Sequence, residues 1–362
     1  MPFLWCMRGF VFAILTLQVI AGAAQQPWSI GVRGHYGFLW AHRPASWILV
    51  EGHAGASELF VERRVEGDKA WHRSFKLPRY GVLVLHTRMA NPERIGSAIG
   101  VAPYLSLPLV EGNHVSFNLR LGWGVGYIAK PFNRRENTKQ IAIGSRINAA
   151  IQIMPELRID AGRLALHAGI GVNHWSNGSV KQPNLGLNFI SASLGASYAL
   201  GKAPPERTVT ETPGYERERR EFSVVGAFGM SEGGRPLNGQ RSVYSLSGDA
   251  SWRVGAKGAL SGGIDVFNKG DLPTVLLELE GKSRAELTQA GVHVGASLLM
   301  GRGELLLHCG AYLITPAPDD APVYQRLGMR YRAGKHLLAS LCLKTHFATA
   351  DHWELGIGYR WH

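Results

Sequence analysis

The sequence contains few cysteines and no long apolar segment beyond its N-terminus. Of 362 residues only three are cysteine: Cys6, Cys309 and Cys342. Cys6 would be removed with an export signal. Cys309 and Cys342 fall on opposite faces of their predicted strands, so we do not expect a disulfide between them. A transmembrane helix needs about 20 consecutive apolar residues, and no such run follows the N-terminus. The sequence therefore excludes a helical membrane protein.

Two further features are missing from the sequence: a metal-binding motif, and acidic side chains over one long stretch. No cluster of cysteine and histidine has the spacing of a metal site, so we expect no cofactor and no catalytic metal. A calcium requirement stays open. Neither Asp nor Glu occurs between Asp160 and Glu206. A histidine in that stretch that acts as a base must therefore be oriented by an amide, or by an acid from elsewhere in the chain.

The N-terminus has the pattern of an export signal. Arg8 supplies a positive charge, an apolar run extends from Phe10 to Ile20, and Ala21-Gly22-Ala23 is a small-residue cleavage site. We expect a signal peptide over residues 1–23, with cleavage after Ala23 or Ala24. The mature protein is therefore expected to be exported.

The remaining apolar residues alternate with small and polar ones. Between 115 and 127 every odd position is apolar: Val115, Phe117, Leu119, Leu121, Trp123, Val125 and Tyr127. Successive side chains of a strand point to opposite faces, and tilted strands of about 10 residues cross a bilayer. The pattern predicts an all-β fold, an outer-membrane antiparallel β-barrel. A periplasmic β-sandwich is the alternative. Arg120, Arg146 and His167 are expected to form a polar plug inside the barrel.

The chain divides into two halves of about eight predicted strands each, an even number being typical of bacterial barrels. Strands of the first half are expected near residues 27–40, 46–61, 78–88, 96–110, 114–128, 140–153, 163–175 and 185–200. Residues 203–220 are rich in Pro, Thr, Glu and Arg and form a predicted linker. We therefore expect one barrel over 24–202 and a second barrel-like domain of unassigned role over 221–362. One barrel of about sixteen strands is the alternative. If the first half closes alone, a fragment ending near Gly201 should fold and keep its activity.

Residues 174–188 carry the candidate catalytic chemistry. His174 and Ser176 lie two apart at the end of an alternating strand, so both belong to its apolar, lipid-facing side. A serine hydroxyl needs a base to become a nucleophile, and histidine is the usual base. Asn184 and Asn188 have the matching parity on the next predicted strand. A hairpin between the two strands would bring all four side chains to one patch of the outer wall.

Residues from about 71 to 200 resemble the PagL-type lipid A 3-O-deacylases, a family often labelled acyloxyacyl hydrolase. Supporting stretches lie at 127–132 and 142–145. The motifs that carry the resemblance are His174-x-Ser176-Asn177-Gly178, Gln182-Pro183-Asn184-x-Gly186 and Asn188. We identify no resemblance for the second half of the chain.

The resemblance implies an eight-stranded outer-membrane barrel that removes an ester-linked acyl chain from lipid A. In that family pattern Ser176 corresponds to the nucleophile, His174 to the catalytic histidine, and Asn184 to a residue of the oxyanion hole. The acidic member of the family's triad falls at Asn188, which we expect to orient His174. If an acid is required, Glu136 is a candidate. The competing hypothesis is a non-enzymatic barrel, either a small porin or a structural scaffold.

Basic residues gather in loops that are predicted to face outward. If the chain begins in the periplasm, the strand that ends at Ser176 ends on the outer side, where lipopolysaccharide lies. Arg134, Arg135 and Lys181, together with Asn177, are candidate contacts for the phosphates of lipid A; simple solvation is the alternative. The expected partners are lipopolysaccharide and outer-membrane lipids, with a possible homodimer. Despite the formal net charge of +12 we expect no nucleic-acid partner for an exported barrel.

Overall fold

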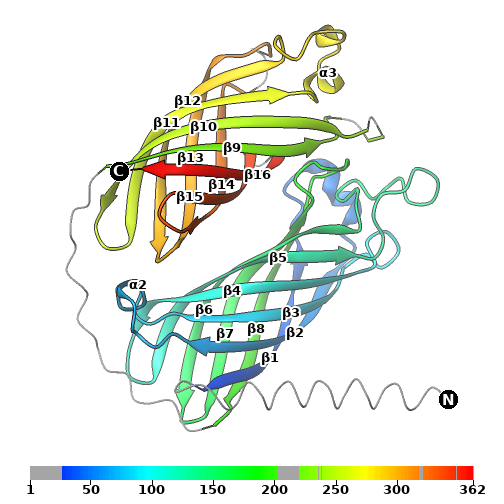
Figure 1. Cartoon of the computed structure of the whole chain (residues 1–362). Helices are drawn as coiled ribbons and strands as arrows, with labels where there is room; N and C mark the ends of the chain where they lie inside the picture. The colour runs from blue at the N-terminus through cyan, green and yellow to red at the C-terminus, as the bar shows by residue number, and fades with distance from the viewer. Residues whose placement is uncertain are drawn as a thin grey trace, which may run out of the picture.

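The computed structural model describes residues 27–201 and 220–361, apart from 235, 238, 318–320 and 348. The predicted signal peptide and the linker up to residue 219 fall outside the described residues. The described chain forms two closed antiparallel barrels of eight strands each (Figure 1). Two barrels rather than one of sixteen strands are thus confirmed. Within the described residues no helix has the length and apolar character to cross a membrane.

The first barrel follows the chain order, and β1 pairs with β8 to close it. Its strands are β1 (Trp28–Leu39), β2 (His53–Arg64), β3 (Arg79–Arg88), β4 (Ser97–Glu111), β5 (Val115–Ile128), β6 (Ile147–Ala161), β7 (Leu164–Ser176) and β8 (Leu187–Ala199). A short 3-10 helix η1 (Pro44–Leu49) follows β1, and a single helical turn α2 (Ala70–Ser74) follows β2.

The second barrel repeats this plan and closes by pairing β16 with β9. Its strands are β9 (Glu221–Ser231), β10 (Arg241–Val254), β11 (Gly258–Lys269), β12 (Thr288–Met300), β13 (Gly303–Ile314), β14 (Val323–Ala333), β15 (Leu337–His346) and β16 (Thr349–Trp361). The short helices α3 (Leu272–Val275) and η2 (Leu277–Leu279) follow β11. Cys309 is exposed and Cys342 is buried, and neither forms a disulfide, as predicted.

Each barrel has an apolar outer wall and a polar interior. On β7 the exposed side chains are Leu164, Leu166 and Ile170, whereas His167 and Asn173 are buried inside. This is the pattern of a barrel whose outer wall faces lipid. The strand parity that the sequence indicates is therefore the parity of the structure.

Paired charges fill the interior of the first barrel. Arg120 donates to Glu58 at 2.6 Å, and Arg33 donates to Glu156 at 2.7 Å. Pairing of this kind offsets the cost of removing charged groups from water. Arg120 and His167 are interior residues, as expected. Arg146 is not: it is exposed before β6 and donates to the Tyr127 hydroxyl at 2.9 Å.

Two predicted strands were misplaced. Strand β6 begins at Ile147 rather than near 140, because Ala142 and Ile143 are fully buried in the preceding loop and pack in the apolar core under the loops. The alternation there reflects a packed loop and not a strand. The second predicted strand begins too early as well, because Pro44–Leu49 forms a 3-10 helix.

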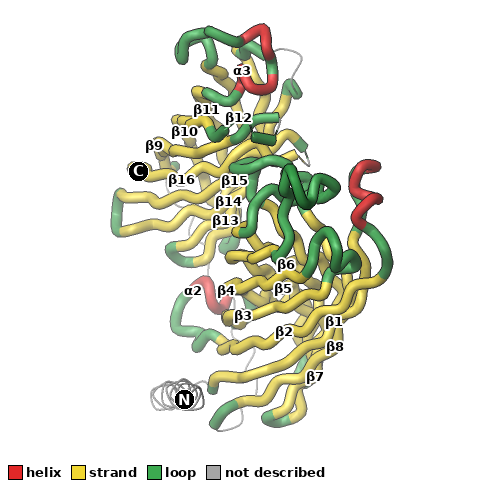
Figure 2. The backbone as a smooth tube through the Cα atoms, turned by 90° about the vertical axis from the view of Figure 1, so that its right-hand side faces the viewer, coloured by secondary structure: helices red, strands yellow, loops and turns green. Residues whose placement is uncertain are grey.

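The two barrels lie against each other, with the ends at which β1 and β9 begin on the same side (Figures 1 and 2). At the end where the strands β1 and β9 begin, the Lys257 ammonium lies 5.4 Å from the centre of the Phe75 ring. On the outer walls, the indoles of Trp123 and Trp353 stack with ring centres 5.5 Å apart. At the opposite end, the loop between β7 and β8 contacts the second barrel. Contacts at both ends set the two barrels side by side.

Candidate active site

The strands β7 and β8 place three predicted site residues on the outer wall of the first barrel. His174 pairs directly with Asn188 across the two strands. Ser176 lies two residues beyond His174 and therefore shares its face. The loop from Asn177 to Gly186, hereafter the active-site loop, connects the two strands and carries Asn184.

A hydrogen bond orients the His174 imidazole. Its Nδ1 lies 2.7 Å from Asn188 Oδ1. Because an amide oxygen only accepts, Nδ1 carries a proton, and in the neutral imidazole Nε2 is then unprotonated. This is the tautomer that a general base needs. The structure thus brings His174 and Asn188 together, whereas Glu136 is exposed in the loop before β6.

His42 is a site residue that the sequence analysis missed. Its Nδ1 accepts a hydrogen bond of 2.9 Å from Asn188 Nδ2. His42 lies in the segment after β1, 146 residues before Asn188 in the chain. No local pattern marks it, since only closure of the barrel by β1 and β8 brings this segment to the site.

Asn184 offers an unused hydrogen-bond donor and contacts Asn177, the residue that follows Ser176. The Asn177 backbone N–H donates to Asn184 Oδ1 at 2.8 Å. Since a backbone N–H only donates, the amide oxygen must face it. The Asn184 NH₂ group is then left buried and without a partner among the described residues. An unpaired buried donor costs about 1–3 kcal/mol, and an oxyanion hole uses a donor of this kind.

Ser176 is 4% exposed, and its hydroxyl forms no hydrogen bond with another described residue. Catalytic hydrogen bonds are often long without substrate and shorten in the complex. Gly186 makes room for the base beside it. Its φ is +80°, and a Cβ there would lie 2.7 Å from His174 Cε1. Both the backbone conformation and the imidazole therefore require glycine at this position.

The four weaker candidates differ in their availability. Arg134, Arg135 and Lys181 are exposed in loops at the same end of the barrel as Ser176. The Asn177 side chain is instead used within the protein: its Nδ2 donates to Ser145 Oγ at 2.9 Å and to the Lys181 carbonyl at 2.8 Å. It therefore has no N–H left for the phosphate contact that the sequence suggested.

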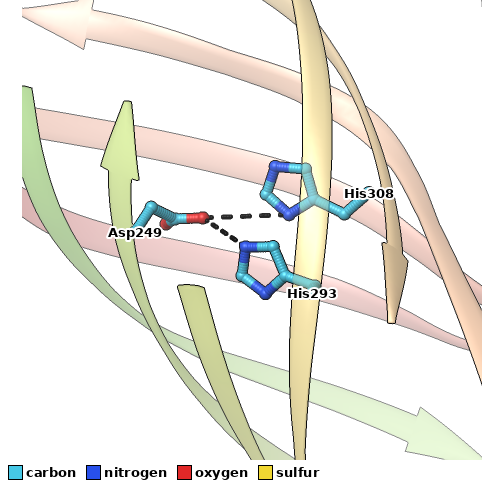
Figure 3. Close-up of side chains that lie close together, drawn as sticks. All are labelled: Asp249, His293 and His308. Carbon is cyan, nitrogen blue, oxygen red and sulfur yellow. Dashed lines mark hydrogen bonds and ion pairs between the residues drawn. The ribbon is translucent and has the colours of Figure 1, made fainter. Parts of the chain in front are cut away.

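A second polar cluster lies inside the second barrel (Figure 3). His293 bridges Asp249 at 3.0 Å and Asp265 at 2.8 Å, and His308 Nδ1 lies 3.8 Å from Asp249. The two imidazoles stack with ring centres 4.3 Å apart and planes 11° apart. A metal must lie near the plane of each ring that binds it, and parallel stacked rings offer no such common point. Arg330 already donates to Asp249 at 3.0 Å. The cluster is therefore best described as an internal charge network.

The fold and the site together define a β-barrel membrane protein with a hydrolase-like constellation on its outer wall. Residues 15–197 match the family described as "Lipid A 3-O-deacylase (PagL)". Residues 220–362 match the family described as "Acyloxyacyl hydrolase, C-terminal domain". The chain belongs to the lipid A 3-O-deacylase family, and it is an outer-membrane β-barrel hydrolase of that family. The second half, for which the sequence analysis identified no resemblance, thus matches a described domain family as well.

Solved structures show weaker likenesses. The "outer membrane enzyme PagL" is 19% identical over 46% of this chain and 97% of its own, with a TM-score of 0.34. A triple mutant of the Rhodopseudomonas blastica porin is 9% identical over 93% of this chain and 100% of its own, with a TM-score of 0.21. Neither likeness bears on function. The comparison with curated proteins finds no match.

Proposed function

We propose that this protein is a serine esterase that hydrolyses an ester-linked acyl chain of lipid A in the outer membrane. The observation that carries the proposal is the 2.7 Å hydrogen bond between His174 Nδ1 and Asn188 Oδ1. It holds an unprotonated Nε2 on the same strand face as Ser176, in a chain of the deacylase family. A porin or a structural scaffold would have no use for an imidazole oriented in this way.

In the first half of the reaction Ser176 is the nucleophile. Its Oγ attacks the ester carbonyl carbon while His174 Nε2 takes the hydroxyl proton. The Asn184 NH₂ group donates to the oxyanion of the tetrahedral intermediate. The ester C–O bond then breaks, and His174 returns its proton to the departing lipid A hydroxyl.

In the second half, water replaces the sugar-linked product. His174 accepts a proton from the water as its oxygen attacks the acyl carbon, and then protonates Ser176 Oγ as the acyl–serine bond breaks. The products are a free fatty acid and lipid A with one acyl chain fewer.

Asn188 performs one of the two roles of a triad carboxylate. Exchange of the acid for asparagine in a serine protease lowers turnover about 10⁴-fold, largely because the histidine adopts the wrong tautomer. Here His42 accepts from the Asn188 NH₂ group, so the amide oxygen stays toward His174. The tautomer is thereby retained, although an amide adds no charge to stabilise the imidazolium.

The surroundings of the site suit a lipid substrate. The side chains around Asn188 are mostly apolar and include Trp40, Leu49 and Ala142. These side chains lie on the β1–β8 side of the site, whereas the second barrel packs against Trp123 of β5. We infer that the acyl chain enters from the β1–β8 side. The exposed Lys181, Arg134 and Arg135 at the same end supply charge for the phosphates.

Replacement of the nucleophile and the base tests the proposal. We expect Ser176→Ala and His174→Ala each to lower deacylation roughly 10⁴-fold or more, as in other serine hydrolases. Mass spectrometry of lipid A from cells that express each variant measures the effect. Ser57→Ala, at an exposed position of β2, is the matched control and should leave activity unchanged. Full activity of either site variant would favour the non-enzymatic barrel.

A further inference from the structure

The second barrel holds the first part of the active-site loop through a tryptophan. Trp353 of β16 donates from its indole Nε1 to the Asn177 carbonyl at 3.1 Å. The same indole fills the space beside Gly178, where φ is +63° and a Cβ would lie 2.2 Å from Nε1. Trp353 is itself supported by its stack on Trp123 of the first barrel. The residue that directly follows Ser176 is therefore fixed from outside its own barrel.

Glu232, the residue after β9, holds the other part of the loop. Its backbone N–H donates to the Ser179 carbonyl at 2.9 Å, and its carboxylate accepts from the Gln182 backbone N–H. The residue is 5% exposed, and its carboxylate also accepts from the Leu237 N–H at 2.9 Å. Gln182 lies two residues before Asn184, so this contact fixes the approach to the oxyanion donor.

Two further hydrogen bonds complete the contact. Ser179 Oγ donates to the Ala350 carbonyl at 2.7 Å, and Gln240 Nε2 donates to the Val180 carbonyl at 3.1 Å. Loops of this length are usually mobile, because few contacts restrain their backbone. This loop has partners along most of its first six residues, and they come from the strand ends of a second closed barrel.

We propose that the C-terminal barrel is a positioning element of the esterase site, in which Trp353 and Glu232 hold the active-site loop so that Ser176 and Asn184 keep their spacing. The catalytic part of this inference rests on the proposed function. Misplacement of a reacting group by about 1 Å can lower a rate 10²-fold, and sites on rigid elements are placed more accurately than sites on free loops. The second barrel supplies that rigidity to a loop.

Variants of the full chain separate positioning from folding. Trp353→Phe removes the indole N–H but keeps an aromatic ring, and Glu232→Ala removes the carboxylate. We expect each to lower kcat for lipid A about threefold to tenfold, the effect of one net hydrogen bond, while KM stays within about twofold. Trp361→Phe is the matched control: it lies at the far end of the same strand, stacks on Phe222 and should change neither constant.

Backbone hydrogen exchange over residues 177–182 provides a readout that does not need activity. We expect faster exchange in Trp353→Phe and Glu232→Ala than in the wild type, and no change in Trp361→Phe. If the wild type leaves lipid A intact, the proposed function fails, whereas exchange still tests the loop contact. Wild-type exchange in both site variants, or faster exchange with unchanged kcat, would overturn the positioning role. Should Trp353→Phe not fold, Glu232→Ala alone decides.

Discussion

Asn188 stands between two imidazoles, and its amide satisfies both in only one orientation. The oxygen accepts from His174 Nδ1, and the NH₂ group donates to His42 Nδ1. If the amide turned over, its NH₂ group would face His174. The proton would then move to Nε2, and His174 could no longer take the proton of Ser176. In the proposed reaction His42 would thus be a positioning residue that acts through Asn188.

Replacement of His42 tests this role. We expect His42→Ala to lower kcat about threefold to tenfold, because the amide then has no acceptor that favours one orientation. Steady-state kinetics on lipid A measure the loss. His53→Ala, at an exposed position of β2, should be indistinguishable from the wild type. An unchanged kcat in His42→Ala would show that other contacts suffice to orient Asn188.

Turnover should depend on the residue at position 188, falling in one variant and holding or rising in another. Asn188→Ala should lower turnover roughly 10²- to 10⁴-fold, because His174 loses its orienting partner. Asn188→Glu should retain activity or raise it, since a carboxylate also stabilises the imidazolium. Turnover of the purified variants distinguishes these outcomes. If Asn188→Ala matches the wild type, another group orients His174, and Glu136 would be the next residue to replace.

Among the elements, the hairpin of β7 and β8 determines which side chains meet. The side-chain period of two is a local property, so the sequence is sufficient to place His174 and Ser176 on one face. The same reasoning failed before β6, where buried Ala142 and Ile143 imitate a strand although they belong to a loop. Alternation shows which residues are buried, but it does not show whether their backbone pairs with a neighbouring strand.

Gly186 lies close to His174 of β7, so catalysis should be sensitive to its replacement. Gly186→Ala would place a methyl group 2.7 Å from His174 Cε1 at a φ of +80°, so the imidazole must move. We expect kcat to fall about tenfold or more while the barrel stays folded. Gly34→Ala is the control, since a Cβ at Gly34 meets no atom within 4 Å. Equal kcat in Gly186→Ala and the wild type would mean that the site tolerates a displaced His174.

At the scale of the whole molecule, the closure of both barrels predicts how the first barrel behaves without the second. In the first barrel β1 pairs with β8, so a fragment of residues 24–201 has no open sheet edge and should fold in detergent. The fragment lacks Trp353 and Glu232, however. We now expect it to deacylate lipid A with a kcat about tenfold or more below that of the full chain. Heat-modifiable gel mobility measures folding, and lipid A mass spectrometry measures activity.

Two results would contradict this prediction. Aggregation of the fragment in several detergents would mean that the first barrel needs the second to fold. A folded fragment with full activity would agree with the simpler expectation from the sequence, in which the first half works alone. That result would also contradict the role given to the second barrel.

The sequence by itself determined the fold class and the outward face shared by His174, Ser176 and Asn188, and it favoured two units while leaving one barrel of sixteen strands open. Each of these depends on local properties: side-chain parity, the length of a crossing strand, and the composition of a linker. The tertiary structure alone decided that each half closes, that His42 supports Asn188, and that Trp353 and Glu232 hold the active-site loop. These contacts join segments that are far apart in the chain. They arise from barrel closure and from the packing of one barrel on the other, which no local pattern encodes.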